Sequence, residues 1–124
     1  MKRFYRYHWA LVVVLLAVSL SCLASRSDAR SGLISITITN NLTGLEINRV
    51  FLSPTDRDKW GPDQLKGSTI APAASATLEN VACDAADLKV IAEDQNGCFF
   101  YQTVACGENF TWTIANNATP DCGN

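Results

Sequence analysis

Apolar and polar residues alternate with a period of two over several short stretches of the chain. The clearest stretch is residues 33–39, where Ile34, Ile36 and Ile38 alternate with serine and threonine. β-Branched and hydroxyl residues at this period are typical of a strand with one face in a core and one in water. We therefore expect a strand whose isoleucines point inward.

The same pattern predicts further strands between turn-forming residues. They cover residues 46–52, 75–81, 88–93, 98–104 and 110–115, with a brief edge strand at 68–70. In the first of these, Val50 and Leu52 share one face, and Ile47 joins them only if a β-bulge intervenes. In the last, Phe110, Trp112 and Ile114 alternate inward.

The strands at 88–93 and 98–104 flank Asp94-Gln95-Asn96-Gly97. Asn-Gly supplies the positive φ angles of a tight turn, so the segment predicts a β-hairpin. Cys83 and Cys106 fall opposite one another at its open end, where a disulfide could close it.

These elements predict an all-β fold. Short strands, turns every ~8–12 residues and no amphipathic helix favour a small antiparallel β-sandwich of about six to seven strands. The chain has no internal repeat and no linker, so residues 30–124 are expected to form one domain.

The first 29 residues have the pattern of a secretory signal peptide: a basic start, a short apolar run and small residues beyond it. The apolar run is shorter than a membrane-spanning helix usually requires. Ala24 and Ala29 both end segments that a signal peptidase could cut. An alternative is a lipoprotein leader that ends before Cys22, although Leu20 lies one place later than the usual lipoprotein pattern. A secreted or periplasmic location is expected, with a membrane-tethered lipoprotein as the alternative.

Cleavage after Ala29 would leave 95 of the 124 residues, with six basic and eleven acidic side chains and a net charge of −5. An acidic domain without a basic cluster argues against nucleic acid or an anionic membrane surface as a partner.

Four cysteines follow the leader: Cys83, Cys98, Cys106 and Cys122. An even number in a small exported domain indicates two disulfides, for which three pairings are possible. The hairpin favours Cys83–Cys106, which leaves Cys98 to fix the tail at Cys122. The competing interpretation, a four-cysteine zinc site, lacks the C-x-x-C pair common in such sites.

The sequence carries no motif for a cofactor, and its single histidine, His8, lies in the leader. Catalysis by Ser–His–Asp or Cys–His groups is therefore excluded after the leader, as are histidine-ligated zinc sites.

Carboxylates remain. Asp56, Asp58 and Asp63 lie close together in the loop at residues 53–67 and are the candidates for a glycoside-hydrolysing pair. Loop aspartates more often cap and form turns, and a small sandwich offers little room for a cleft. The same loop faintly resembles a calcium site, but Trp60 and Gly67 occupy positions where ligands belong.

Two aromatic features have alternative interpretations. Trp60 either folds back with Leu65 to plug one end of the core, or is an exposed platform for a sugar or peptide. In the run Phe99-Phe100-Tyr101, one parity faces the core and the other is left outside, where exposed rings can mark a partner surface.

The order of landmarks resembles a group of small exported bacterial β-sandwich domains of unknown function. The landmarks are Asn40-Asn41-Leu42-Thr43-Gly44, Ser53-Pro54, Trp60-Gly61, Leu65, Pro72, Cys83, Glu93-Asp94 with Gly97, Cys106 and Trp112. Three features depart from the group: Ala73-Ala74 where a glycine usually turns the chain, the extra Ala85-Ala86, and the second cysteine pair. The resemblance implies fold and export, since no activity is attached to the group.

Two functions remain as hypotheses. The first is a non-enzymatic binding module whose candidate binding loop carries Asp56, Asp58, Trp60 and Asp63, with a protein or glycan partner in the envelope. The second is a small carboxylate-dependent envelope hydrolase.

Overall fold

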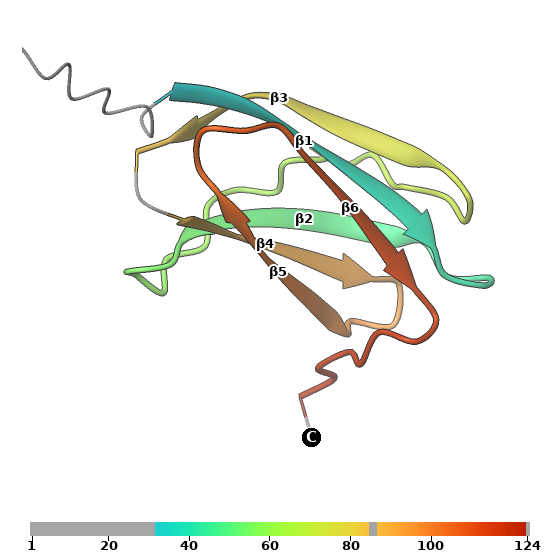
Figure 1. Ribbon diagram of the computed structural model, residues 1–124. Coiled ribbons are helices and arrows are strands. Elements are labelled where there is room, and N and C mark those ends of the chain that lie inside the picture. The colour runs from blue at the N-terminus through green and yellow to red at the C-terminus, as the bar shows by residue number, and fades with distance from the viewer. Residues whose placement is uncertain (1–31, 85–86, 124) are drawn as a thin grey trace, which may run out of the picture.

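The computed structural model describes residues 32–84 and 87–123, which form two packed three-stranded sheets (Figure 1). The strands are β1 (Gly32–Asn41), β2 (Ile47–Pro54), β3 (Ser75–Cys83), β4 (Asp87–Asp94), β5 (Phe99–Ala105) and β6 (Phe110–Ala115). The predicted all-β sandwich is therefore confirmed. The predicted leader with its predicted cut sites, Cys22 and the Ala85-Ala86 insertion lie outside the described residues.

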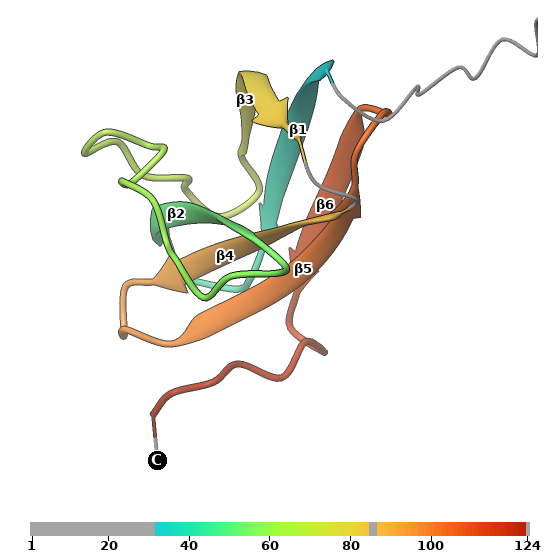
Figure 2. The ribbon, with the colours of Figure 1, turned by 90° about the vertical axis from the view of Figure 1, so that its left-hand side faces the viewer.

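Each sheet has a different pairing pattern. One has the order β3-β1-β6, in which β1 runs antiparallel to β3 and parallel to β6. The other has the order β2-β4-β5 and is antiparallel throughout. Figure 2 shows the two sheets as separate layers, with the loop that follows β2 passing in front of β4 and β5.

The core lies between the two sheets and is built from the inward positions that the alternation predicts. Its buried strand residues are Ile34, Ile36, Ile38, Leu78, Val81, Cys83 and Ile114 from one sheet, and Ile47, Val50, Leu88, Val90, Ala92, Phe100 and Val104 from the other. Phe110 and Trp112 are half-buried and pack against this core, in agreement with the inward alternation predicted for β6.

A β-bulge turns Ile47 into the core. The pairing of β2 with β4 shifts between Ile47 and Arg49, so one extra residue of β2 lies there. Ile47 is fully buried as a result, as the sequence pattern required. The predicted edge strand at 68–70 is reduced to a single bridge between Ile47 and Ile70.

Both predicted disulfides are present, and the zinc interpretation is wrong because all four cysteines are paired. Cys83–Cys106 closes the open end of the β4–β5 hairpin, and Cys98–Cys122 joins the start of β5 to the tail. The two loops span 23 and 24 residues. Loops of that length correspond to about 3 kcal/mol of stabilisation per bridge in the chain-entropy account.

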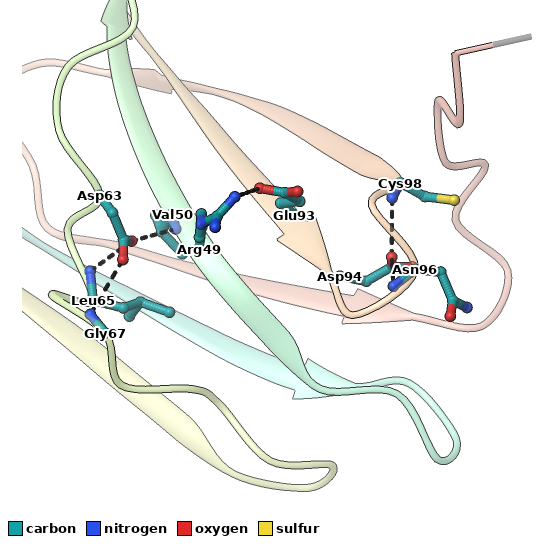
Figure 3. A network of polar contacts seen from close by, with 9 residues as sticks. All are labelled: Arg49, Val50, Asp63, Leu65, Gly67, Glu93, Asp94, Asn96 and Cys98. Atoms are coloured by element: carbon teal, nitrogen blue, oxygen red, sulfur yellow. Dashed lines mark hydrogen bonds and ion pairs between the residues drawn. The ribbon is translucent and has the colours of Figure 1, made fainter.

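The hairpin turn differs from the expected one in a single respect. Gly97 has a φ of 79°, but Asn96 does not adopt a positive φ. The Gly97 N–H donates to the Asp94 carbonyl, as in three-residue hairpin loops. The buried Asp94 carboxylate accepts from the N–H groups of Asn96 and Cys98 at 2.9 and 3.0 Å (Figure 3). It therefore fixes the turn that carries the second disulfide.

Asn40 is a buried polar centre at the end of β1. Its amide donates to the carbonyls of Leu45 and Ile70 at 2.8 and 2.9 Å, and its side-chain oxygen accepts from the Leu42 N–H. Its backbone also bonds with Ala73 and Ala74. One side chain thus ties the β1–β2 turn to the loop that precedes β3.

Candidate functional site

The outer face of β2–β4–β5 carries an apolar row across all three strands. Register places Phe51 beside Ile91, and Ile91 beside Tyr101. Ile91 lies outside the core cluster and yet is fully buried, so something covers it from the solvent side.

Trp60 provides aromatic cover on that face. Its ring centroid lies 5.5 Å from that of Phe51, 5.3 Å from Phe99 and 6.4 Å from Tyr101. We call Phe51, Trp60, Phe99 and Tyr101, with Ile91 in the same row, the aromatic face. Separations of 4.5–7 Å are those of favourable aromatic pairs, so the indole is fixed by three neighbours.

This placement corrects one prediction. Trp60 does not plug an end of the core, because it packs on the outside of a sheet and keeps 37% of its surface exposed. Leu65 does belong to the core. Phe100 points inward, which leaves Phe99 and Tyr101 on the outside, one of the two parities that the sequence allowed.

Charged groups border the aromatic face. The Lys89 ammonium lies 3.9 Å from a carboxylate oxygen of Asp58 and 6.0 Å from the centroid of the Tyr101 ring. Burial raises the pKa of the Tyr101 hydroxyl. The Asp121 carboxylate raises this pKa further through its charge and through hydrogen bonding, and the charge of Asp58 has the same effect. Donors and acceptors therefore lie beside the exposed rings.

The loop that carries Trp60 is fastened to the edge of β2. Asp63 accepts from the N–H groups of Val50, Leu65 and Gly67 at 3.1, 3.0 and 3.3 Å (Figure 3). Burial opposes its ionisation, but these three donors and the nearby Arg49 outweigh burial and lower the pKa of Asp63.

Backbone bonds extend this attachment along the strand. The N–H groups of Gly61 and Gln64 donate to the carbonyls of Leu52 and Val50 at 3.1 and 2.7 Å. Ser53 is buried and donates its hydroxyl to the Arg57 carbonyl. Hydrogen bonds therefore attach the loop to β2 both before and after Trp60.

The three loop carboxylates have separate partners. Asp56 is paired with its neighbour Arg57, Asp58 with Lys89, and Asp63 with backbone donors. A catalytic acid requires a raised pKa, whereas that of Asp63 is lowered. Within residues 32–84 and 87–123, no three acidic, histidine or cysteine side chains are placed to ligate a metal ion.

Sequence reasoning identified Trp60 and the Phe99–Tyr101 pair but missed Phe51, Ile91 and Lys89. The sequence does contain a signal for Phe51 and for Ile91. Val50 and Leu52 face inward, so parity sends Phe51 outward, and the unbroken run Val90-Ile91-Ala92 is typical of a strand covered on both faces.

The outer face of the other sheet is different in chemistry. Register aligns two rows of hydroxyl side chains across β3, β1 and β6: Ser75–Thr39–Thr113 and Thr77–Thr37–Thr111. We call these six residues the hydroxyl face. Two of its pairs are hydrogen-bonded, Thr37 with Thr77 at 3.0 Å and Thr39 with Ser75 at 2.8 Å.

One end of the sandwich has a cavity of about 220 Å³ beside the Cys83–Cys106 bridge. Its charged lining is Asp56, Arg57, Asp84 and Asp87. Acidic side chains around a small opening indicate no particular ligand, and we assign it no role.

No family model matches the chain, and no curated protein matches it either. The chain is similar to a protein from Eubacterium rectale solved by NMR, at 13% identity and a TM-score of 0.43. That similarity covers 73% of this chain and 85% of the other. In the part of the chain that the structure describes, no helix has the length and apolar character needed to span a membrane.

Proposed function

We propose that this protein is a non-enzymatic binding module of the secreted or cell-envelope class, which recognises its partner through the aromatic face. The observation that carries the proposal is the placement of Trp60. An indole with 37% of its surface exposed is fixed by three other rings on the outside of a sheet. Exposed aromatic clusters mark recognition surfaces, and tryptophan and tyrosine are enriched among binding hot spots.

The two disulfides support the proposed location. Bridges of this kind persist in oxidising compartments such as the periplasm or the extracellular space. A domain with two bridges suits that setting.

The proposal is tested with fluorescently labelled protein and envelopes from the cells that produce it. We expect saturable binding by the wild-type protein and a loss of at least about tenfold in affinity for Trp60→Ala. The matched control is Thr113→Ala on the hydroxyl face, which should bind as the wild type does. Equal binding by both variants, or no saturable binding, would contradict the proposal.

The hydrolase hypothesis makes a different prediction for the same preparations. A hydrolase would release soluble products from the envelope, and replacing Asp56, Asp58 and Asp63 with asparagine would stop the release while the fold persists. Release that depends on these carboxylates would overturn the proposal. A binding module should show none.

A further inference from the structure

The aromatic face presents two rings to solvent on a rigid base. Trp60 and Tyr101 are 37% and 43% exposed, whereas Phe51 and Phe99 are half-buried beside them. The indole already has three ring contacts, so little side-chain freedom remains to be lost when a ligand stacks on it.

The exposed area suits a small ligand unit. A large aromatic side chain covers ~150–250 Å² in all, and Trp60 and Tyr101 expose 37% and 43% of theirs. The two rings therefore offer at most about a quarter of the ~800 Å² that each partner contributes to a standard protein interface. Two rings are instead comparable in size with one or two sugar units.

Polar groups lie beside the exposed rings, since the Lys89 ammonium is 6.0 Å from the centroid of Tyr101. The Asp58 side chain is 87% exposed, and its 3.9 Å contact with Lys89 is a long, solvent-exposed ion pair. Such pairs contribute little to stability, so both groups are available to a ligand. Together they offer an acceptor and a donor, which matches hydroxyl groups that donate and accept.

The charges also favour one kind of sugar. Asp58 and Asp121 both place negative charge near the Tyr101 hydroxyl, and the backbone of Asp121 pairs with that of Phe99 in an isolated bridge. The Lys89 ammonium, 3.9 Å from Asp58, is partly neutralised by that carboxylate. A carboxylate, sulfate or phosphate on the ligand would be repelled by this acidic border. A pyranose ring without charge would keep the ring contact, because its C–H groups are attracted to the negative face of an aromatic system.

From these observations we infer that the aromatic face binds an uncharged pyranose unit of a glycan, stacked on Trp60 and hydrogen-bonded by Asp58 and Lys89. The inference rests on the proposed function, since it names the ligand class of the same surface.

The test uses the full-length protein and its intrinsic tryptophan fluorescence. Uncharged hexasaccharides of β-1,4-linked glucose, β-1,4-linked N-acetylglucosamine and α-linked mannose are titrated to millimolar concentration, beside hexagalacturonate as an anionic ligand of equal length. Trp112 lies in β6 of the other sheet and Trp9 in the predicted leader, so Trp112→Phe, made also together with Trp9→Phe, preserves the signal of Trp60.

We expect a saturable change in emission with at least one uncharged hexasaccharide, unaltered in Trp112→Phe. Hexagalacturonate should bind at least about tenfold more weakly. Asp58→Ala changes an exposed side chain and should weaken binding severalfold in a folded protein, so the test does not depend on the folding of Trp60→Ala. Binding of hexagalacturonate as tight as that of the uncharged ligands, or no change with Asp58→Ala, would overturn the inference.

The result separates the two proposals. If no uncharged hexasaccharide binds, the inference is wrong. The binding module still stands if envelope binding depends on Trp60 and is abolished by protease treatment of the envelope, which would identify a protein partner. If envelope binding does not depend on Trp60, both proposals fail.

Discussion

Each outer face of the sandwich belongs to a three-stranded sheet, but one face carries hydroxyl side chains and the other carries apolar and aromatic ones. The hydroxyl face satisfies part of its hydrogen bonding within itself, through pairs such as Thr37 with Thr77. The aromatic face buries Ile91 outside the core and is partly covered by a loop. An antiparallel sheet needs only one buried face to fold, and the second apolar face is the observation from which we propose a role in binding.

The largest expected contrast between the faces is in stability. Ile91→Ala removes a fully buried side chain from beneath the loop and should lower the free energy of unfolding by about 3 kcal/mol. Thr37→Ala on the hydroxyl face should cost less than about 1 kcal/mol. Urea unfolding measures both, and equal costs would mean that the aromatic face contributes no more to the stability of the fold than the hydroxyl face does.

Asp63 tests how firmly the loop is attached to the aromatic face. Asp63→Asn keeps one acceptor oxygen but loses the charge and the bond from Gly67, so it should cost about 1–2 kcal/mol at neutral pH. The pKa of Asp63 is lowered in the folded state, so its contribution is present above the unfolded pKa of about 4. The contribution is lost as the pH falls through the lower, folded value.

The measurement for Asp63 is a series of urea unfolding curves from neutral to acidic pH. The difference between the wild type and Asp63→Asn should shrink below about pH 4. A difference that stays constant to acidic pH would show that the charge of Asp63 is not what fastens the loop.

Ala73 allows the stability of the domain to be raised without touching the aromatic face. Its φ is 66°, a conformation that is strained for alanine and free of strain for glycine. Ala73→Gly should therefore raise the free energy of unfolding by up to about 1 kcal/mol, while Ala76→Gly within β3 should lower it. Thermal unfolding of the two variants checks the sign, and binding to envelopes should be unchanged in Ala73→Gly.

The smallest expected effect concerns the border of the aromatic face. Burial and Asp121 raise the pKa of Tyr101, so Asp121→Asn should bring that pKa down towards the ordinary tyrosine value. Ultraviolet absorbance during an alkaline titration follows the hydroxyl. Because the folded pKa is raised, the associated stability is present below about pH 10 and is lost above it. An unshifted titration would mean that Asp121 does not face the tyrosine.

Much of the fold could be predicted from the sequence because its signals are local. The alternation of Ile34, Ile36 and Ile38 sets a strand and its inward face. The turn at Gly97 sets a hairpin, and the hairpin brings Cys83 to Cys106. The second bridge then follows from the cysteines that remain.

The burial of Asn40 and the position of Trp60 could not be predicted in this way, because they depend on contacts between segments that are distant in the sequence. Asn40 lies in a segment whose residues are typical of an exposed turn. It is nevertheless fully buried, and its side chain donates a hydrogen bond to the carbonyl of Ile70, 30 residues away. The position of Trp60 could not be predicted, since it depends on which side of the sheet the loop crosses. The loop is held to the edge of β2 by long-range bonds such as that from the Val50 N–H to Asp63, and spacing alone does not reveal such a bond.

The most direct test of the account is to map the surface that native envelope material contacts. Amide and indole resonances of ¹⁵N-labelled protein are followed by NMR while soluble envelope fragments from the producing cells are added. We predict that Trp60, Lys89 and Tyr101 shift with a common saturation curve while Thr39 and Thr113 do not. Shifts confined to the hydroxyl face, or spread equally over both faces, would contradict the account.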